Sequence, residues 1–325
     1  MRRNILLVVV LLLAASTAFI VWKAKKDPST NIARTDSNFK IEDVNTIDRI
    51  IITQKDGTRS DLKRSGENWT INGNHRVRKS NIEHLLRGIN QQHLEHIPGP
   101  AAAKNILASM EEHGIHVEIF DKSGNKLLAY SVGGVTQDER GTFFVKEGSN
   151  QPYSLTEPGF DGSLRVRYAL RPVDWRDIRF WVEENDNIDT LKVHYPKQRQ
   201  HSFIIYKKGN DYGVLPMFST TPKRENENAV KIKSYLTTLS GLAGENYLNE
   251  SPEKDSIVQS IPFMEMEMKY PDKTSSLRFF PAEYVGDRNS PTIFRYFIDY
   301  VGKDFLIGQH EVLKGAFRSY EYFFE

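Results

Sequence analysis

The order of sequence patterns in this chain of 325 residues repeats once, and this internal repeat constrains the fold more than any other feature. The segment that begins at Ile47 resembles the one that begins at Ile188, and similar pairs of segments follow in the same order up to Gly162 and Gly315. In each half, two strand-like segments precede two helix-like segments, and four strand-like segments follow. Self-similarity of this kind indicates a duplicated structural unit. We therefore expect two tandem β-β-α-α-β-β-β-β units.

The spacing of apolar residues predicts the type of each element. Residues at i, i+3, i+4 and i+7 predict one amphipathic helix per half. They are Ile82, Leu85, Leu86 and Ile89 in the first half and Ile232, Tyr235, Leu236 and Leu239 in the second. Met264, Met266 and Met268 alternate with glutamates, which predicts a strand with one buried face. Because strands cluster apart from helices, we expect an α+β fold with antiparallel sheets and helices on one face.

Local signals predict where some elements begin and end. Ser80 and Glu83 fit a capping box at the start of the first helix. Gly114 follows a shorter helix expected at 101–112 and is typical of a left-handed C-cap. Gly57 and Gly124 lie in expected hairpin turns, where residues must tolerate positive φ.

An uncharged apolar run covers residues 5–22. As a helix it rises about 1.5 Å per residue, nearly enough to cross a bilayer core of about 30 Å. One interpretation is a retained signal-anchor, and the other is a cleaved signal peptide with its cleavage site at Ser16-Thr17-Ala18. We favour the anchor, because the apolar run continues past that site to Trp22. We expect a short cytoplasmic tail at 1–4, a transmembrane signal-anchor at 5–22 and a flexible tether at 23–40.

Charge and cysteine content restrict the function further. The chain has 44 Lys+Arg and 42 Asp+Glu, but residues 1–26 carry five basic residues and no acidic one, so the rest is slightly acidic. This distribution gives no support for a nucleic-acid partner. The absence of cysteine excludes disulfides, thiol nucleophiles and thiolate zinc sites. A short tail before a long domain favours export, so we expect a single-pass protein of the inner membrane with its C-terminal domain in the periplasm.

A connector rich in aromatic residues and arginine, expected at 171–187, joins a first α+β unit at 41–170 to a second at 188–325. It holds the densest charged cluster of the sequence, which we take as a candidate partner or junction surface. Its members are Arg171, Asp174, Trp175, Arg176, Asp177 and Trp181. These charges either form salt bridges between the units, which we favour, or build a polar site in which Asp174 and Asp177 act as acid and base carboxylates.

Motifs of common enzymes and metal sites are missing. His93 and His96 lie three residues apart at the end of the first expected helix, where they could share a metal ion. His93 also continues the apolar stripe of that helix, so a boundary position is the better explanation. We expect no catalytic residue, no metal and no cofactor. An envelope hydrolase that uses Asp174 and Asp177 is the alternative, and a ligand-binding module without a partner is a third hypothesis.

Several short motifs carry a resemblance to a known family. They are I-x-x-I-x-I at 47–52, a basic strand ending in W-x-I at 69–71, V-x-x-x-x-I-x-x-L-L-x-x-I at 77–89, and L-R-x-x-D-W-R-D at 170–177. With the apolar N-terminal run, they resemble the family known as domain of unknown function 4340, over about residues 40–325. The second half departs from the pattern, with Tyr212 in place of the tryptophan.

The resemblance implies a membrane-anchored bacterial envelope protein, related to domains that accompany gliding-motility and other ABC-type transport systems. It implies no catalytic residues, because the family has none established. We therefore expect a non-catalytic binding or scaffold subunit with protein partners, accessory to an ABC-type transport or gliding-related complex.

Overall fold

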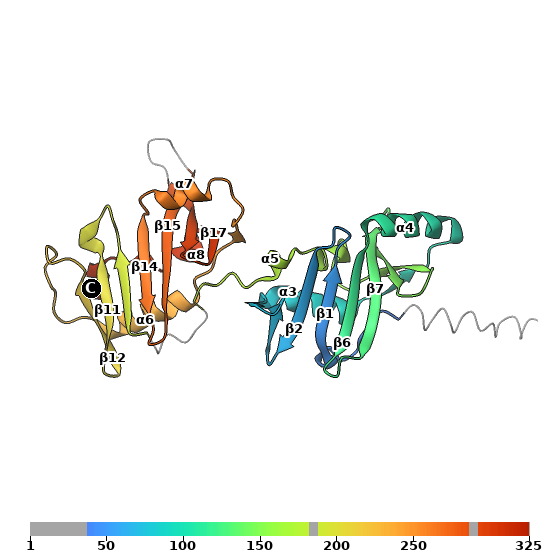
Figure 1. The fold of residues 1–325 in the computed structure, drawn as a ribbon, viewed down its shortest axis with the longest axis horizontal. Coiled ribbons are helices and arrows are strands. Elements are labelled where there is room, and N and C mark those ends of the chain that lie inside the picture. Colours follow the sequence, from blue (N-terminus) through green and yellow to red (C-terminus); the bar gives the residue numbers. More distant parts are fainter. Residues whose placement is uncertain (1–37, 182–187, 286–291, 325) are drawn as a thin grey trace, which may run out of the picture. The chain divides into compact units, whose positions relative to one another are not determined.

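The computed structural model describes residues 38–181, 188–285 and 292–324 (Figure 1). The chain divides into two compact units, of which unit 1 ends at Arg176 and unit 2 begins at Asp177. Each unit holds one antiparallel sheet and few helices, which confirms the mixed α and β class. The expected anchor at 5–22 and most of the tether at 23–40 lie outside the described residues. Within the described ranges, no helix is long and apolar enough to cross a membrane.

Unit 1 is built around a sheet of nine described strands in the order β4-β3-β2-β1-β6-β7-β8-β9-β5. The strands are β1 (Ile47–Thr53), β2 (Arg59–Ser65), β3 (Asn68–Ile71), β4 (His75–Arg76), β5 (His93–His96), β6 (Ile115–Asp121), β7 (Lys126–Val135), β8 (Thr142–Lys146) and β9 (Pro152–Thr156). The helices are α3 (Lys79–Gln91), α4 (Pro100–His113) and α5 (Pro172–Trp175), with 3-10 turns at Val44–Thr46 and Leu164–Arg167.

The core of unit 1 lies between one face of this sheet and α3, which crosses behind the strands in Figure 1. The predicted stripe of α3 is confirmed, since Ile82, Leu85 and Ile89 are buried and Leu86 packs against the same core. Trp175 is fully buried in this core. Burial of such apolar surface, at about 25 cal/mol per Å², is what stabilises the unit.

Unit 2 is built around eight described strands in the order β12-β11-β10-β14-β15-β16-β17-β13. They are β10 (Thr190–His194), β11 (Phe203–Lys208), β12 (Asp211–Pro216), β13 (Asn246–Tyr247), β14 (Met264–Lys269), β15 (Thr274–Val285), β16 (Thr292–Tyr300) and β17 (Asp304–Gln309). The helices are α6 (Ala229–Ser240), α7 (Lys254–Gln259) and α8 (His310–Leu313), with 3-10 turns at Arg199–His201 and Tyr320–Phe324. The predicted stripe of α6 is confirmed, because all four of its residues are buried.

The two sheets share one topology. If the short edge strand β4 is set aside, the strand order of unit 1 matches that of unit 2 position by position. The registers also match at the centre of each sheet. Ile50 lies opposite Leu62 and Ile119, and Leu191 lies opposite Ile205 and Met268 in the same arrangement. Residues at matching positions of the two units can therefore be compared directly.

The element order is more interrupted than the expected β-β-α-α-β-β-β-β pattern. The single basic strand expected to end at Ile71 is a hairpin, because Gly66 adopts a φ of 61° and reverses the chain between β2 and β3. Gly209 does the same between β11 and β12 with a φ of 64°. A short edge strand also separates the two helices of each unit, β5 in unit 1 and β13 in unit 2.

The structure differs from two of the local predictions. The expected capping box is wrong, because α3 begins at Lys79 with Arg78 at the N-cap, which leaves Ser80 inside the first turn. The left-handed cap at Gly114 is also wrong, because its φ is −63°. Glycine is needed there for space, since a Cβ would lie 2.4 Å from the Met110 carbonyl oxygen. The turns at Gly57 and Gly124 are confirmed by φ values of 85° and 84°.

Candidate functional site

A pocket of about 520 Å³ lies on the outer face of the unit 2 sheet, the face turned away from its core. We call it the unit 2 groove. Its lining residues are Lys192, His194, Met217, Glu265, Met266, Glu267, Ser276, Leu277, Arg278 and Val301. Its volume falls within the range of about 300–1,000 Å³ typical of small-ligand pockets. The alternation of β14 creates its floor, because Met264, Met266 and Met268 are buried as predicted while the intervening glutamates face outward.

A row of polar side chains crosses four strands at the groove, and in it two carboxylates alternate with a histidine and an arginine. Strand register places His194, Glu265, Arg278 and Asp299 side by side on β10, β14, β15 and β16. The His194 Nδ1 lies 3.0 Å from the Glu265 Oε2. At the other end of the row, the Arg278 Nε donates to the Asp299 Oδ2 at 2.8 Å. Cross-strand pairs of opposite charge contribute roughly 0.2–1 kcal/mol each to a sheet.

A second, shorter row runs beside the first. Lys192 lies opposite Glu267, and its Nζ donates to the Glu267 Oε1 at 2.7 Å. Ser276 follows on β15, opposite Glu267 on the other side. Both charged side chains are close to half exposed, so this pair is open to exchange with an incoming charged group.

Groups from other elements contact His194 and Arg278 of the first row. The Phe218 ring packs against His194 with their centroids 5.6 Å apart, and the Arg199 guanidinium stacks over Phe218 at 4.3 Å. The Arg278 Nη1 donates to the Val258 carbonyl oxygen in α7 at 3.1 Å. The apolar side chain of Val301 is 45% exposed beside the floor.

This arrangement suits binding better than acyl-transfer chemistry. The His194 Nε2 is buried and has no hydrogen-bond partner in the described residues, so it cannot reach a substrate proton in this conformation. Ser276 lies opposite Glu267 in the second row, two strands away from His194 in the first row. Ser276 and His194 therefore do not form a nucleophile–base pair. The described groove therefore holds paired charges without an activated nucleophile.

The same face of unit 1 lacks these rows. Its matching positions carry Thr53, His116, Ser131 and Val145 instead of the first charged row. The backbone is thus repeated but the outward side chains are not. The charged groove is a property of unit 2 and not of the repeated fold.

The predicted junction residues divide between the two units. Arg171, Asp174, Trp175 and Arg176 belong to unit 1. The Arg171 Nε donates to the Asp174 Oδ2 at 2.9 Å, and this hydrogen bond holds the pKa of Asp174 below its ordinary value. Arg176 forms a backbone bridge with Val77.

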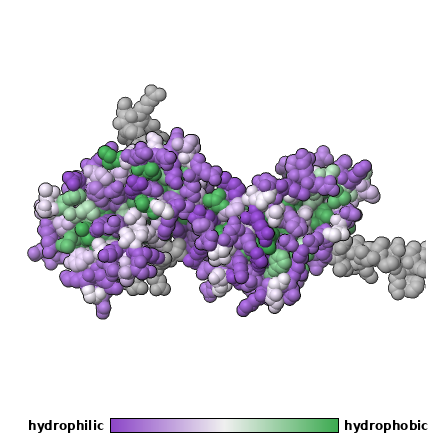
Figure 2. All heavy atoms as spheres, viewed as in Figure 1, coloured by the Kyte–Doolittle hydropathy of each residue, from purple (hydrophilic) through white to green (hydrophobic). Residues whose placement is uncertain are grey.

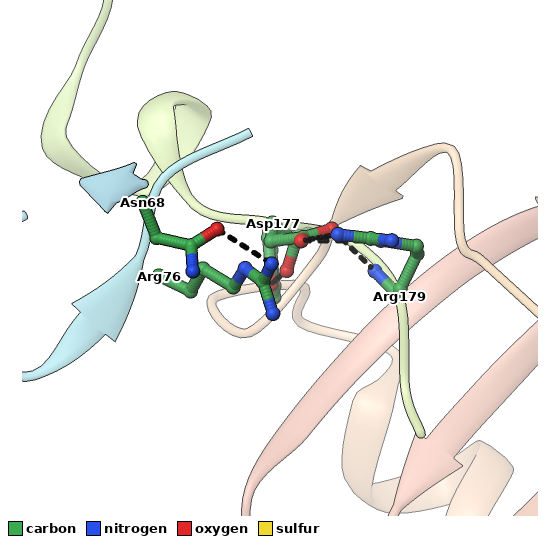
Figure 3. Close-up of polar contacts among 5 residues, drawn as sticks. Asn68, Arg76, Asp177 and Arg179 are labelled. Carbon is green, nitrogen blue, oxygen red and sulfur yellow. Dashed lines mark hydrogen bonds and ion pairs between the residues drawn. The ribbon is translucent and has the colours of Figure 1, made fainter. Parts of the chain in front are cut away.

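Asp177 and Trp181 belong to unit 2. Arg179 Nε donates to the Asp177 Oδ1 at 3.0 Å, and Figure 3 shows this ion pair as well as the Arg76–Asn68 hydrogen bond of unit 1. The Trp181 Nε1 donates to the Ser275 Oγ at 3.0 Å in the core of unit 2. Neither Trp175 nor Trp181 therefore offers a surface, because both are buried.

The prediction that His93 and His96 lie on a helix is wrong. His93 and His96 lie on the edge strand β5, which pairs with β9, because α3 ends at Gln91. Another set of potential metal ligands comes together in unit 1, formed by His116, Glu118 and Glu147. This set could not be predicted from the sequence, because Glu147, just after β8, meets His116 and Glu118 of β6 only when the sheet forms.

Most of the surface visible in Figure 2 is hydrophilic, with hydrophobic side chains in small separate patches.

Comparison with known proteins adds no assignment: no protein-family model, no curated protein and no solved structure matched the chain.

Proposed function

We propose that this chain is a non-catalytic, membrane-anchored envelope protein that serves as a binding subunit of a larger complex. The apolar run at 5–22 supports the anchor. The resemblance to domain of unknown function 4340 supports a bacterial envelope setting and an accessory role in an ABC-type transport or gliding-related system. In this proposal the two units lie outside the cytoplasm and the unit 2 groove contacts the partner.

The observation that carries the binding role is the pair of charged rows across the unit 2 groove. Their carboxylates alternate with Lys192, Arg278 and the imidazole of His194, so the groove complements a partner segment that carries both acidic and basic side chains. Such a segment can exchange its charges for those of Lys192 and Glu267 without leaving a buried charge unpaired. Complementary charges of this kind give specificity and register more than raw affinity.

A hydrolase site at Asp174 and Asp177 receives little support from the geometry. A general acid needs a raised pKa, whereas Arg171 lowers the pKa of Asp174. Arg179 holds the Asp177 carboxylate through the bonds shown in Figure 3. We expect replacement of both by asparagine to leave the cellular phenotype unchanged.

Affinity purification of the tagged, full-length chain after mild crosslinking tests the binding role. The wild type should recover the same membrane protein repeatedly, and the double variant Lys192→Glu with Arg278→Glu should recover at least about tenfold less, a loss of about 1.4 kcal/mol. Lys233→Glu serves as the matched control, because Lys233 forms an exposed ion pair with Asp211 outside the groove. Equal recovery by all three proteins would argue against the groove.

The side of the membrane on which the two units lie needs a separate measurement. A reporter fused after residue 325 and read on both sides of the membrane should be active outside the cytoplasm. Activity inside would overturn the envelope setting while leaving the binding role to the purification experiment.

A further inference from the structure

A second site, independent of the proposed function, lies on the outer face of unit 1. His116, Glu118 and Glu147 each offer one ligand atom, and these atoms lie within 4.8 Å of one another. His116 and Glu118 are two residues apart on β6 and therefore point to the same side of the sheet. The His116 Nε2 lies 4.0 Å from the Glu147 Oε1.

The backbone positions of these residues are well fixed. β6 is an inner strand that pairs with β1 on one side and β7 on the other. Glu147 follows β8, and its backbone N–H donates to the Ala129 carbonyl oxygen at 2.9 Å. Sites built on strands position their ligands more precisely than sites on loops.

The two carboxylates already hold a cation, the ammonium group of Lys126. Its Nζ lies 2.9 Å from the Glu118 Oε1 and 3.0 Å from the Glu147 Oε2. These contacts raise the pKa of Lys126, the hydrogen bond to Glu118 being the largest cause. Lys126 is partly exposed on a long flexible stem, so it can turn into solvent when another cation takes its place.

We propose that His116, Glu118 and Glu147 bind a divalent transition metal that displaces Lys126 from between the carboxylates. Imidazole nitrogen and carboxylate oxygen are both ligands of zinc, and zinc sites with three protein ligands take a water molecule in the fourth position. The imidazole disfavours Ca²⁺ and Mg²⁺, which prefer oxygen ligands only. Zn²⁺ is therefore the expected ion.

Unit 2 cannot form the same site. Its matching positions carry Glu265 and Glu267 in place of His116 and Glu118. Val301 stands at the position of Glu147, since its N–H donates to the Ser276 carbonyl oxygen as that of Glu147 does to Ala129. Among the described residues this ligand set therefore occurs in unit 1, where we expect one zinc ion to bind.

Isothermal titration of the full-length chain with Zn²⁺ at pH 7.5 tests this proposal. The wild type should show one saturable site, and His116→Ala should weaken it at least tenfold. Lys126→Met should tighten it, because the competing ammonium is gone. His113→Ala is the control, since the imidazole of this exposed histidine lies 3.7 Å from the Glu112 carboxylate and is not one of the three proposed ligands. Thermal unfolding of each variant without zinc checks that the fold is intact.

The absence of a saturable site, or equal affinity in the wild type and His116→Ala, would overturn the proposal. Unchanged affinity in Lys126→Met would overturn the displacement of Lys126.

Discussion

The imidazole of His194 contacts the carboxylate of Glu265 across β10 and β14, with 3.0 Å between Nδ1 and Oε2. The matching positions of unit 1 hold Thr53 and His116, which form no such pair in the described structure. The two units thus share strand order and register but differ in the chemistry of their outer faces. This difference separates the unit 2 groove from the metal site proposed in unit 1.

A buried ion pair in unit 1 gives the first prediction. Glu157 and Arg167 have side chains only 3% and 6% exposed, with 2.6 Å between Glu157 Oε2 and Arg167 Nη1. Glu157→Gln should lower the free energy of unfolding by about 3–5 kcal/mol, because it leaves the guanidinium buried without its counter-charge. Urea denaturation measures this loss. Lys79→Met, which removes the exposed pair with Glu83, should change it by no more than about 0.5 kcal/mol. Similar effects of the two changes would contradict the prediction.

The two glycines that flank α4 give a matched pair of substitutions. Gly114→Ala should destabilise unit 1 by about 1–3 kcal/mol, because the new Cβ would meet the Met110 carbonyl oxygen at 2.4 Å. Gly99→Ala places its Cβ in open space at a φ of −68°, so it should cost at most about 1 kcal/mol, from the preference of an N-cap for glycine over alanine. Thermal unfolding of both variants shows whether a steric clash or the backbone conformation explains the need for glycine at position 114. Equal losses would show that the approach to Met110 is not the reason for glycine.

Alkaline pH should weaken unit 1 through a pair of buried tyrosines. The Tyr130 and Tyr168 hydroxyls lie 3.0 Å apart in the core, and burial raises the pKa of Tyr168 to about 12. The unfolded pKa is about 10, so this stabilisation is complete below pH 10 and is lost as the pH rises toward 12. Tyr168→Phe should reduce the slope of stability against pH in that range. An unchanged slope in the variant would contradict this origin.

Acid pH should act through Asp61. Arg49 Nε donates to its Oδ1 at 2.7 Å, and this hydrogen bond is the largest cause that lowers the pKa of Asp61. A depressed folded pKa contributes stability above the unfolded value of about 3.9, and this contribution is lost as the pH falls through the folded value. Asp61→Asn should therefore flatten the acid limb of the stability curve and lower stability at pH 7. The prediction fails if the two proteins differ equally at pH 7 and pH 2.

Helices and strands whose buried side chains recur with the period of their own backbone could be predicted from the sequence. The methionines of β14 and the stripes of α3 and α6 are buried as expected, because each pattern reports one face of one element. Contacts between residues far apart in the sequence explain why His93 was placed on the wrong element. His93 continues the stripe of α3 by spacing, yet α3 ends at Gln91. The Gln92 side chain then bonds the Phe39 carbonyl oxygen, and His93 pairs with Thr156 on β9.

The groove was missed for a related reason. Alternation marks Lys192 and His194 as outward residues of one strand, and Glu265 and Glu267 as outward residues of another. Which of them lie opposite each other depends on the register between strands far apart in the sequence. A shift of one residue would turn every side chain to the other face, so the charged rows emerge only once the sheet is assembled.

Photocrosslinking from the groove floor tests the central claim most directly. A photoreactive amino acid at Ser276, inside the unit 2 groove, should capture one membrane protein in living cells. The same amino acid at Ser131, on the outer face of the unit 1 sheet, should not capture it. Capture of the same partner from both positions, or from Ser131 alone, would contradict a binding site in the unit 2 groove.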